Sequence, residues 1–195
     1  MKLYLVRHGT SQHQRMHRGR MPGIHLTSKG RREATKTAAF LRKKKITVIY
    51  TSPLERAQET AQIIAKSTKA KVIVAPELNE WNLMVFQGLL PADAKRKNPR
   101  AWKEFVSAPT KIHDNERITA VAARMMKFYK RIQKKHPEKT IVAVSHAGPI
   151  AALLLTLTHH SLDELHTTAK TKGWHPGTGG IVEVQKGLVK QVHLA

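Results

Sequence analysis

The chain has 195 residues, with 35 lysines and arginines against 13 aspartates and glutamates, which gives a formal net charge of +22 at pH 7. The absence of cysteine excludes disulfides, thiolate catalysis and cysteine-ligated zinc. No apolar run approaches the roughly 18 residues of a membrane span and the first is too short for a signal-peptide core, so we expect a cytoplasmic protein without a membrane partner.

The hydrophobic pattern predicts strands and helices in alternation. The first half is expected to contain a strand at 3–6, a helix at 27–45, a strand at 46–51, a helix from 52 to about 67 and a strand at 72–75. Ser52, Pro53 and Glu55 are suited to cap and begin the second helix. After short helices between 91 and 111, the second half is expected to contain a helix from 118 to before Pro137, a strand at 140–144, a helix at 150–157 and a hairpin of strands 180–185 and 188–194.

This alternation predicts an α/β fold with a mostly parallel central sheet, helices on both faces, a small helical insertion at about 89–115 and a C-terminal antiparallel hairpin. We expect a single domain over residues 1–195. Ligands of such sheets bind at the carboxyl ends of the strands. Arg7-His8, Ser52 to Arg56 and His146 each follow a predicted strand, so they are expected to converge on one site.

Each of these residues also has an ordinary structural explanation. A loop histidine such as His8 is often a surface group, and His146 is placed where it would cap a turn. Arg56 would stabilise its helix, but an arginine in the first turn opposes the helix dipole, which favours a ligand role. The other histidines are expected to lie mainly on the solvated surface, with two or three of them at the pocket mouth or on a metal ion as the alternative: His13, His17, His25, His159 and His160.

The chemistry-bearing residues belong to motifs that occur in a fixed order. These are Arg7-His8-Gly9-Thr10, Leu26 to Gly30, Ser52 to Ala61, Leu78 with Glu80 and Gly88, and Ser145 to Gly148. In this order and at comparable spacing they resemble the motifs of the histidine phosphatase superfamily, also called the phosphoglycerate mutase-like family. The resemblance covers nearly the whole chain.

The resemblance implies a role for five residues. His8 would be the nucleophile that takes the phosphoryl group and becomes a phosphohistidine. Arg7 and Arg56 would neutralise the phosphate charge, and His146 would hydrogen-bond the phosphoryl group. Glu80 would protonate the leaving oxygen and then activate water, with Glu77 as the alternative carboxylate. No metal or other cofactor is implied, because the arginines supply the positive charge.

Further phosphate contacts are expected from the backbone amides of Ala147 and Gly148, at a helix start, and from the side chain of Gln14. Gln14 stands where members of the family often carry asparagine. The basic loop before Leu26 and the insertion at 89–115 are expected to determine the substrate. The loop contains three arginines that favour an electropositive pocket rim: Arg15, Arg18 and Arg20.

The resemblance implies a phosphomonoester hydrolase that acts on a small anionic phosphorylated metabolite. A phosphoglycerate mutase is the alternative within the family, but such mutases are longer between the acid and the second histidine. An alternative of another class is a protein that binds nucleic acid or another polyanion through its basic surface. The complete set Arg7, His8, Arg56, Glu80 and His146 argues for catalysis.

Overall fold

The computed structural model describes residues 1–192, which contain a six-stranded sheet in the order β3-β2-β4-β1-β5-β6. The four parallel strands are β1 (Lys2–Arg7), β2 (Ile46–Thr51), β3 (Lys71–Val74) and β4 (Thr140–Ser145). The hairpin of β5 (Ile181–Gln185) and β6 (Leu188–Val192) is antiparallel and joins the sheet beside β1. The predicted α/β fold is therefore confirmed, while the predicted strand residues 193 and 194 lie outside the described residues.

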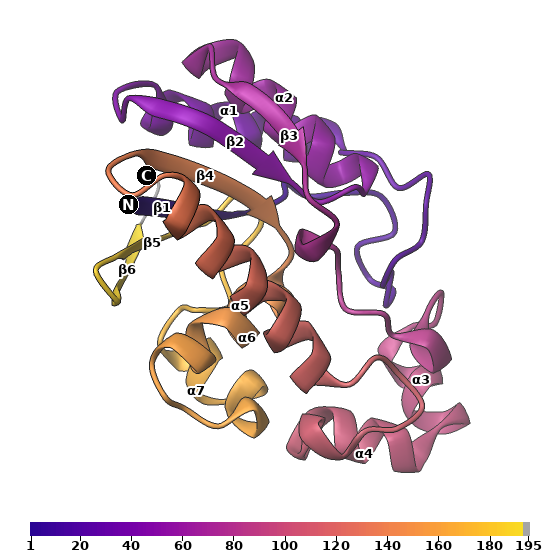
Figure 1. Ribbon diagram of the computed structural model, residues 1–195. Helices are drawn as coiled ribbons and strands as arrows, with labels where there is room; N and C mark the ends of the chain where they lie inside the picture. Colours follow the sequence, from indigo (N-terminus) through magenta and orange to yellow (C-terminus); the bar gives the residue numbers. More distant parts are fainter. Residues whose placement is uncertain (193–195) are drawn as a thin grey trace.

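Helices cover both faces of the sheet (Figure 1). The pairs are α1 (Ser28–Arg42) with α2 (Glu55–Thr68) on one face, and α5 (Ile118–Lys135) with α6 (Ala147–Leu157) on the other. Successive strand residues point to opposite faces, so a strand that is covered twice must be apolar throughout. This explains the unbroken apolar run of β1, where Leu3 and Leu5 pack toward α5 and α6 while Tyr4 and Val6 pack toward α1 and α2.

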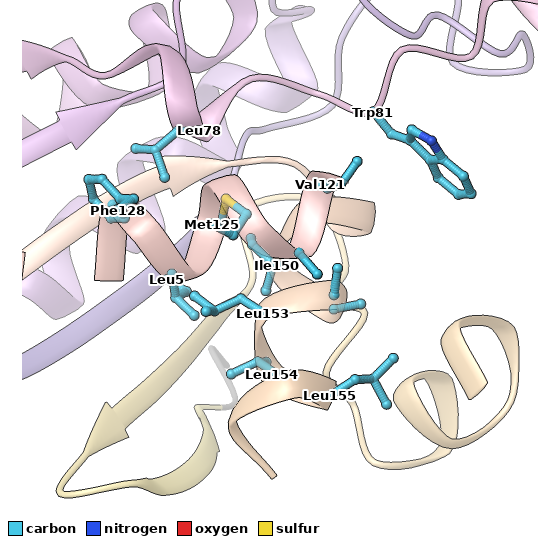
Figure 2. Close-up of a cluster of buried hydrophobic side chains, with 14 of the residues drawn as sticks. Leu5, Leu78, Trp81, Val121, Met125, Phe128, Ile150, Leu153, Leu154 and Leu155 are labelled. Carbon is cyan, nitrogen blue, oxygen red and sulfur yellow. The ribbon is translucent and has the colours of Figure 1, made fainter. Parts of the chain in front are cut away.

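The larger part of the core lies between the sheet and the pair α5 and α6. Figure 2 shows Met125 and Phe128 of α5 and Ile150 and Leu153 of α6 gathered near Leu5 of β1. All five side chains are fully buried. Burial of such side chains contributes about 1.5–3 kcal/mol each, so this cluster stabilises the sheet on which the candidate site is built.

The segment predicted to contain short helices forms α3 (Pro91–Lys97), α4 (Pro99–Ser107) and the 3-10 turn η3 (Pro109–Lys111). Each begins with a proline, whose missing N–H costs nothing at that position. The 3-10 helix η4 (Leu162–His166) and the short helix α7 (Thr168–Thr171) have no counterpart among the predicted elements. Thr110 donates from both its backbone N–H and its hydroxyl to Asp163, which ties the insertion to η4. Within residues 1–192, no helix is long and apolar enough to cross a bilayer.

Three predicted helix boundaries are wrong. The helix α1 ends at Arg42 rather than Lys45, since Lys45 has a φ of 50°, which breaks the helix. The helix α2 begins at Glu55, and the Ser52 side chain does not cap it. The helix α6 begins at Ala147, earlier than predicted, directly after His146. The last two differences change the surroundings of candidate site residues.

The strand order brings the ends of three strands together. Because β4 lies between β1 and β2, the carboxyl ends of these strands are neighbours, with Arg7 opposite Ser145 and Val144 opposite Thr51. The residues that follow these positions are His8, His146 and Ser52. Their convergence at one edge of the sheet follows from topology, as expected for an α/β sheet.

The start of α1 lies directly against the loop that carries His8. The Thr27 side chain accepts from the N–H of Gly30 and donates to the Thr10 carbonyl oxygen, each at 3.1 Å. A methyl group at Gly30 would overlap that same carbonyl group, and one at Gly9 would overlap the Gly30 carbonyl. Glycine is therefore required at both positions by close backbone approach.

We predict that Gly30→Ala destabilises the protein by about 1–3 kcal/mol, because overpacking outweighs the better helix propensity of alanine. Urea denaturation measures this change. Gly177→Ala is the matched control, since a methyl group at Gly177 meets no atom of residues 1–192 within 4 Å. Equal stability of Gly30→Ala and the wild type would show that the loop moves aside without cost.

Candidate active site

His8 is buried at the end of β1, and its Nδ1 lies 2.7 Å from the carbonyl oxygen of Gly9. A carbonyl oxygen only accepts hydrogen bonds, so Nδ1 carries the proton and Nε2 keeps its lone pair. Burial, together with the charge of Arg56 and Arg7, holds the pKa of His8 well below its usual 6.5. The ring is thus neutral at pH 7, with one nitrogen available as a nucleophile.

His146 faces His8, with ring centroids 5.0 Å apart. It precedes α6, but its side chain makes no capping hydrogen bond in the described structure, so the capping explanation does not hold. Its Nε2 lies 2.9 Å from the Ser52 hydroxyl, and its Nδ1 lies 3.6 Å from Oε2 of Glu80. Ser52 therefore supports His146, and its hydroxyl also accepts the N–H of Leu54 at 3.3 Å, just before α2. Sequence reasoning missed this contact because Ser52 also fits a cap.

Arg7 and Arg56 present buried donor groups to the same place. Arg56 is fully buried, and its Nη2 donates to the Gly19 carbonyl at 2.8 Å, while Arg7 Nη1 donates to the Pro176 carbonyl at 2.9 Å. Among residues 1–192, the buried Nε of Arg7 and both Nε and Nη1 of Arg56 have no hydrogen-bond partner. Buried donors are normally paired, so this arrangement favours an anion as their partner.

Arg18 is a third cation at this site and comes from the basic loop. Its Nη1 donates to the Ser11 hydroxyl. Burial and the neighbouring charges of Arg56 and Arg7 lower its pKa to about 10. Sequence analysis placed Arg18 at the pocket rim, together with Arg15 and Arg20, but had no motif that singled it out.

Glu80 lies in the loop that follows β3. Its Oε1 accepts the N–H of Trp81 at 2.9 Å, and burial raises the pKa of the carboxyl group above 4.5 even though Arg56 and Arg7 oppose the shift. The alternative carboxylate, Glu77, does not reach the site, because it pairs with Arg131 at 2.9 Å on an exposed part of α5. The structure therefore brings together Glu80, and not Glu77, with the two histidines.

A partly buried ion-pair network holds the backbone of this loop. Arg124 of α5 donates to the carbonyl oxygens of Glu77, Asn79 and Glu80 at 2.6–3.0 Å. Glu116 pairs with Arg124 at 3.1 Å and with Arg20 at 2.8 Å, and Arg20 also donates to the Glu80 carbonyl. No short-range motif marks these positioning residues, since their partners are far away in the sequence.

A cavity of about 160 Å³ opens beside these groups, and Arg7, Arg18, Glu80, Ala147 and Gly148 are among its lining residues. The two residues at the start of α6 thus lie where an anion would meet backbone amides. Gln14 is exposed and lines a different hollow with Thr10 and Thr27. The structure does not bring Gln14 to the cavity, whereas it brings Arg18 there.

Comparison with known proteins agrees with this geometry. The model of the histidine phosphatase superfamily (branch 1) matches residues 3–174. The chain belongs to this superfamily. This histidine phosphatase is 31% identical over 162 residues to phosphoserine phosphatase 1 of Hydrogenobacter thermophilus, which covers 80% of this chain and 76% of the relative. It is 30% identical over 166 residues to the adenosylcobalamin/alpha-ribazole phosphatase of Escherichia coli K12. This match covers 80% of this chain and 79% of that relative.

The solved structure of YhfR from Bacillus stearothermophilus has the same fold, with a TM-score of 0.85 at 25% identity, covering 97% of this histidine phosphatase and 94% of that chain. The predicted family, and with it the prediction of a phosphatase, is confirmed. The roles of individual residues remain predictions.

We predict that Glu116→Gln lowers the free energy of unfolding by about 1–3 kcal/mol, the cost of losing charge-assisted hydrogen bonds to Arg124 and Arg20. Urea denaturation measures the stability. Hydrogen exchange of the amides at 77–82 should become faster, since their carbonyl anchors loosen. Glu104→Gln is the control, because Glu104 pairs with a mostly exposed arginine and should cost at most about 0.5 kcal/mol. Unchanged exchange in Glu116→Gln would mean that the loop does not depend on the network.

Proposed function

We propose that the protein hydrolyses phosphomonoesters of small metabolites through a phosphohistidine at His8. The observation that carries this proposal is the neutral, buried imidazole of His8, which lies beside donors of Arg7 and Arg56 that have no partner among the described residues. A nucleophile must approach a group that carries negative charge, so the phosphate charge has to be neutralised first. Planar guanidinium groups match phosphate oxygens in geometry and charge.

In the first step, the lone pair of His8 Nε2 attacks phosphorus and the bond from phosphorus to the ester oxygen breaks. Glu80 transfers its proton to that oxygen, so the product leaves as a neutral alcohol. The raised pKa of Glu80 supports this role, because it increases the fraction of the group that is protonated. His146 Nδ1 and Arg18 would stabilise the phosphoryl oxygens as charge redistributes.

In the second step, water attacks the phosphohistidine and the nitrogen–phosphorus bond breaks. The Glu80 carboxylate left by the first step accepts a proton from this water, and inorganic phosphate is released. The Glu80 side chain keeps 19% of its surface exposed, which supports access of water to this carboxylate. We also propose that residues 1–195 act as one catalytic domain, since the candidate residues range from Arg7 to Gly148.

Hydrolysis is favoured over a mutase reaction. A mutase must hold the intermediate away from water until a second hydroxyl accepts the phosphoryl group. The chain is short between Glu80 and His146, where the short elements η2 (Met84–Phe86), α3, α4 and η3 precede α5. Relatives named as phosphatases cover most of the chain. Phosphoglycerate isomerisation that depends on a bisphosphorylated primer would identify a mutase instead.

We predict that His8→Asn lowers the release of phosphate from p-nitrophenyl phosphate at least about 10³-fold, because the nucleophile is lost. In the wild type, rapid denaturation during turnover of a ³²P-labelled ester should trap acid-labile, alkali-stable label on His8. His113→Asn is the control, since His113 is exposed and outside the cavity. Full activity of His8→Asn would rule out the phosphohistidine route.

The pH profile should depend on Glu80. The pKa of His8 is lowered below 6.5, so its nucleophilic form persists into acid, whereas Glu80 must be protonated to serve as the acid. For alkyl phosphates, kcat/KM should therefore fall as pH rises through the raised pKa of Glu80, giving a mildly acidic optimum.

Glu80→Gln should remove the decrease of kcat/KM at alkaline pH. It should also slow the hydrolysis of alkyl phosphates by about 10²–10⁴-fold. Formation of the phosphoenzyme from p-nitrophenyl phosphate should be slowed much less, because p-nitrophenolate leaves without a proton. Phosphoenzyme should then accumulate, since its hydrolysis lacks the base. Equal losses for both ester types would exclude Glu80 as the proton donor.

A further inference from the structure

Exposed lysines gather at the edge of the sheet opposite the candidate active site. The parallel strands begin at this edge, where Lys2 and Ile46 both lie opposite Thr140, and Gln185, the last residue before the hairpin turn, lies opposite Lys2. Figure 1 shows the arrows of β2 and β4 pointing away from the side on which the N-terminus lies. Four connections meet here: α1 to β2, α2 to β3, α5 to β4 and β5 to β6. With the first residue of β3 they carry six exposed lysines, here called the lysine edge: Lys43, Lys45, Lys69, Lys71, Lys139 and Lys186.

Little negative charge balances the lysine edge. None of its six ammonium groups forms an ion pair within residues 1–192. Glu138 is the one carboxylate in the four connections, and the nearby Glu183 already pairs with Lys2 at 3.3 Å. Clustered like charges repel one another and destabilise the compact state. Helix dipoles favour cations directly after a helix, but Lys139 and Lys186 do not directly follow one.

Three lysines of this edge have a backbone conformation that suits other residue types better. Lys45, Lys69 and Lys186 have φ values of 50°, 61° and 50°, in the left-handed region. Glycine and asparagine adopt this conformation at a lower cost than lysine does. A lysine nevertheless occupies the position in three separate connections that meet at one edge. Backbone strain that recurs in this way indicates that the charge of these residues has a function.

The arrangement of the charges matches a linear polyanion. Neighbouring strands of a sheet lie about 4.8 Å apart, so the edge extends for about 20 Å from β3 to the turn between β5 and β6. A nucleic-acid duplex has one base pair per about 3.4 Å, and the edge therefore spans about six base pairs. Lysine contacts phosphate as a point charge and does not read the bases.

Other polyanions fit this edge less well. Proteins that bind single-stranded nucleic acid stack its bases on aromatic rings, but no phenylalanine, tyrosine or tryptophan within residues 1–192 is exposed. Membrane surfaces are bound through apolar side chains in addition to cations. Leu188 is the one exposed large apolar side chain beside the four connections. The phosphate backbone of a duplex requires neither stacking nor insertion.

We propose that the lysine edge binds the phosphate backbone of duplex nucleic acid without reading its sequence. This surface lies at the other end of the sheet from His8, so the inference goes beyond hydrolysis and does not depend on it. If each lysine of the edge neutralises one phosphate, the logarithm of the binding constant falls with the logarithm of the salt concentration with a slope of about −5.

A salt series with a fluorescent DNA duplex of about 20 base pairs tests this proposal. In the triple variant Lys45→Asn/Lys69→Asn/Lys186→Asn the slope should weaken to about −3, because three phosphate contacts are lost. Asparagine suits the left-handed backbone at all three positions, so the urea midpoint of this variant should not decrease. Its release of phosphate from p-nitrophenyl phosphate should match that of the wild type, since the substitutions are far from the cavity.

A second triple variant separates the lysine edge from net charge. Lys95→Gln/Lys97→Gln/Lys103→Gln removes the same charge from exposed positions of α3 and α4, which lie on another side of the molecule (Figure 1). Its salt slope should stay at about −5. Equal weakening of duplex binding by both triple variants would show that net charge alone attracts the duplex, and would overturn the proposal.

Three further results would also overturn it. The first is that the wild type does not bind the duplex at low salt, where phosphate contacts are strongest. The second is tighter binding of a single strand of the same length than of the duplex. The third is that the Asn variant loses binding to phosphatidylserine vesicles while binding the duplex as the wild type does, which would assign the lysine edge to a membrane surface.

Discussion

The structure depends on positive charge that is buried next to uncharged imidazoles. Burial lowers the pKa of Arg7, Arg18 and Arg56, and the charge of Arg7 lowers the pKa of the other two further. Burial together with the charges of Arg56 and Arg7 also keeps His8 and His146 neutral. Removing such cations from water costs several kcal/mol each unless an anion compensates. In the proposed function a phosphate group supplies that compensation, so substrate binding and relief of this electrostatic cost would be the same event. The apolar core under the sheet stabilises the fold in the absence of that partner.

This arrangement requires rigid support, because cations that could move apart would do so. Arg56 is held by its place in α2 and by the Gly19 carbonyl, and His8 by the end of β1 and the Gly9 carbonyl. The neighbouring order of β1, β4 and β2 then sets the spacing of the candidate groups. Glu80 lies in a loop rather than at the end of a strand. The network of Glu116, Arg124 and Arg20 therefore holds this loop in place. The candidate acid is thus positioned by side chains, whereas the nucleophile is positioned by the backbone.

This difference explains how much could be predicted from the sequence. The strands, the parallel sheet and the convergence of His8, Arg56 and His146 follow from apolar periodicity and from motifs at strand ends, which are local signals. Glu116 was missed because its partner Arg20 lies far away in the sequence, and Arg18 was placed only at the pocket rim because no motif links it to Arg7 and Arg56. Ser52 fits a helix cap so well that its contact with His146 could not be read from the pattern. Gln14 was chosen by analogy with an asparagine, yet the loop places it in another hollow.

The high net charge acts on a different scale from the buried arginines. Most lysines and arginines of α1, α3 and α5 are exposed, where salt screens their field beyond about 10 Å. Such charge raises the rate at which any anion reaches the surface and discriminates poorly between anions. The buried guanidinium groups of Arg7 and Arg56 are shielded from solvent, so their effect depends on the position of the anion that they meet. Attraction by the surface and selection by the cavity are therefore separable, and the +22 charge carries no information about the substrate beyond its sign.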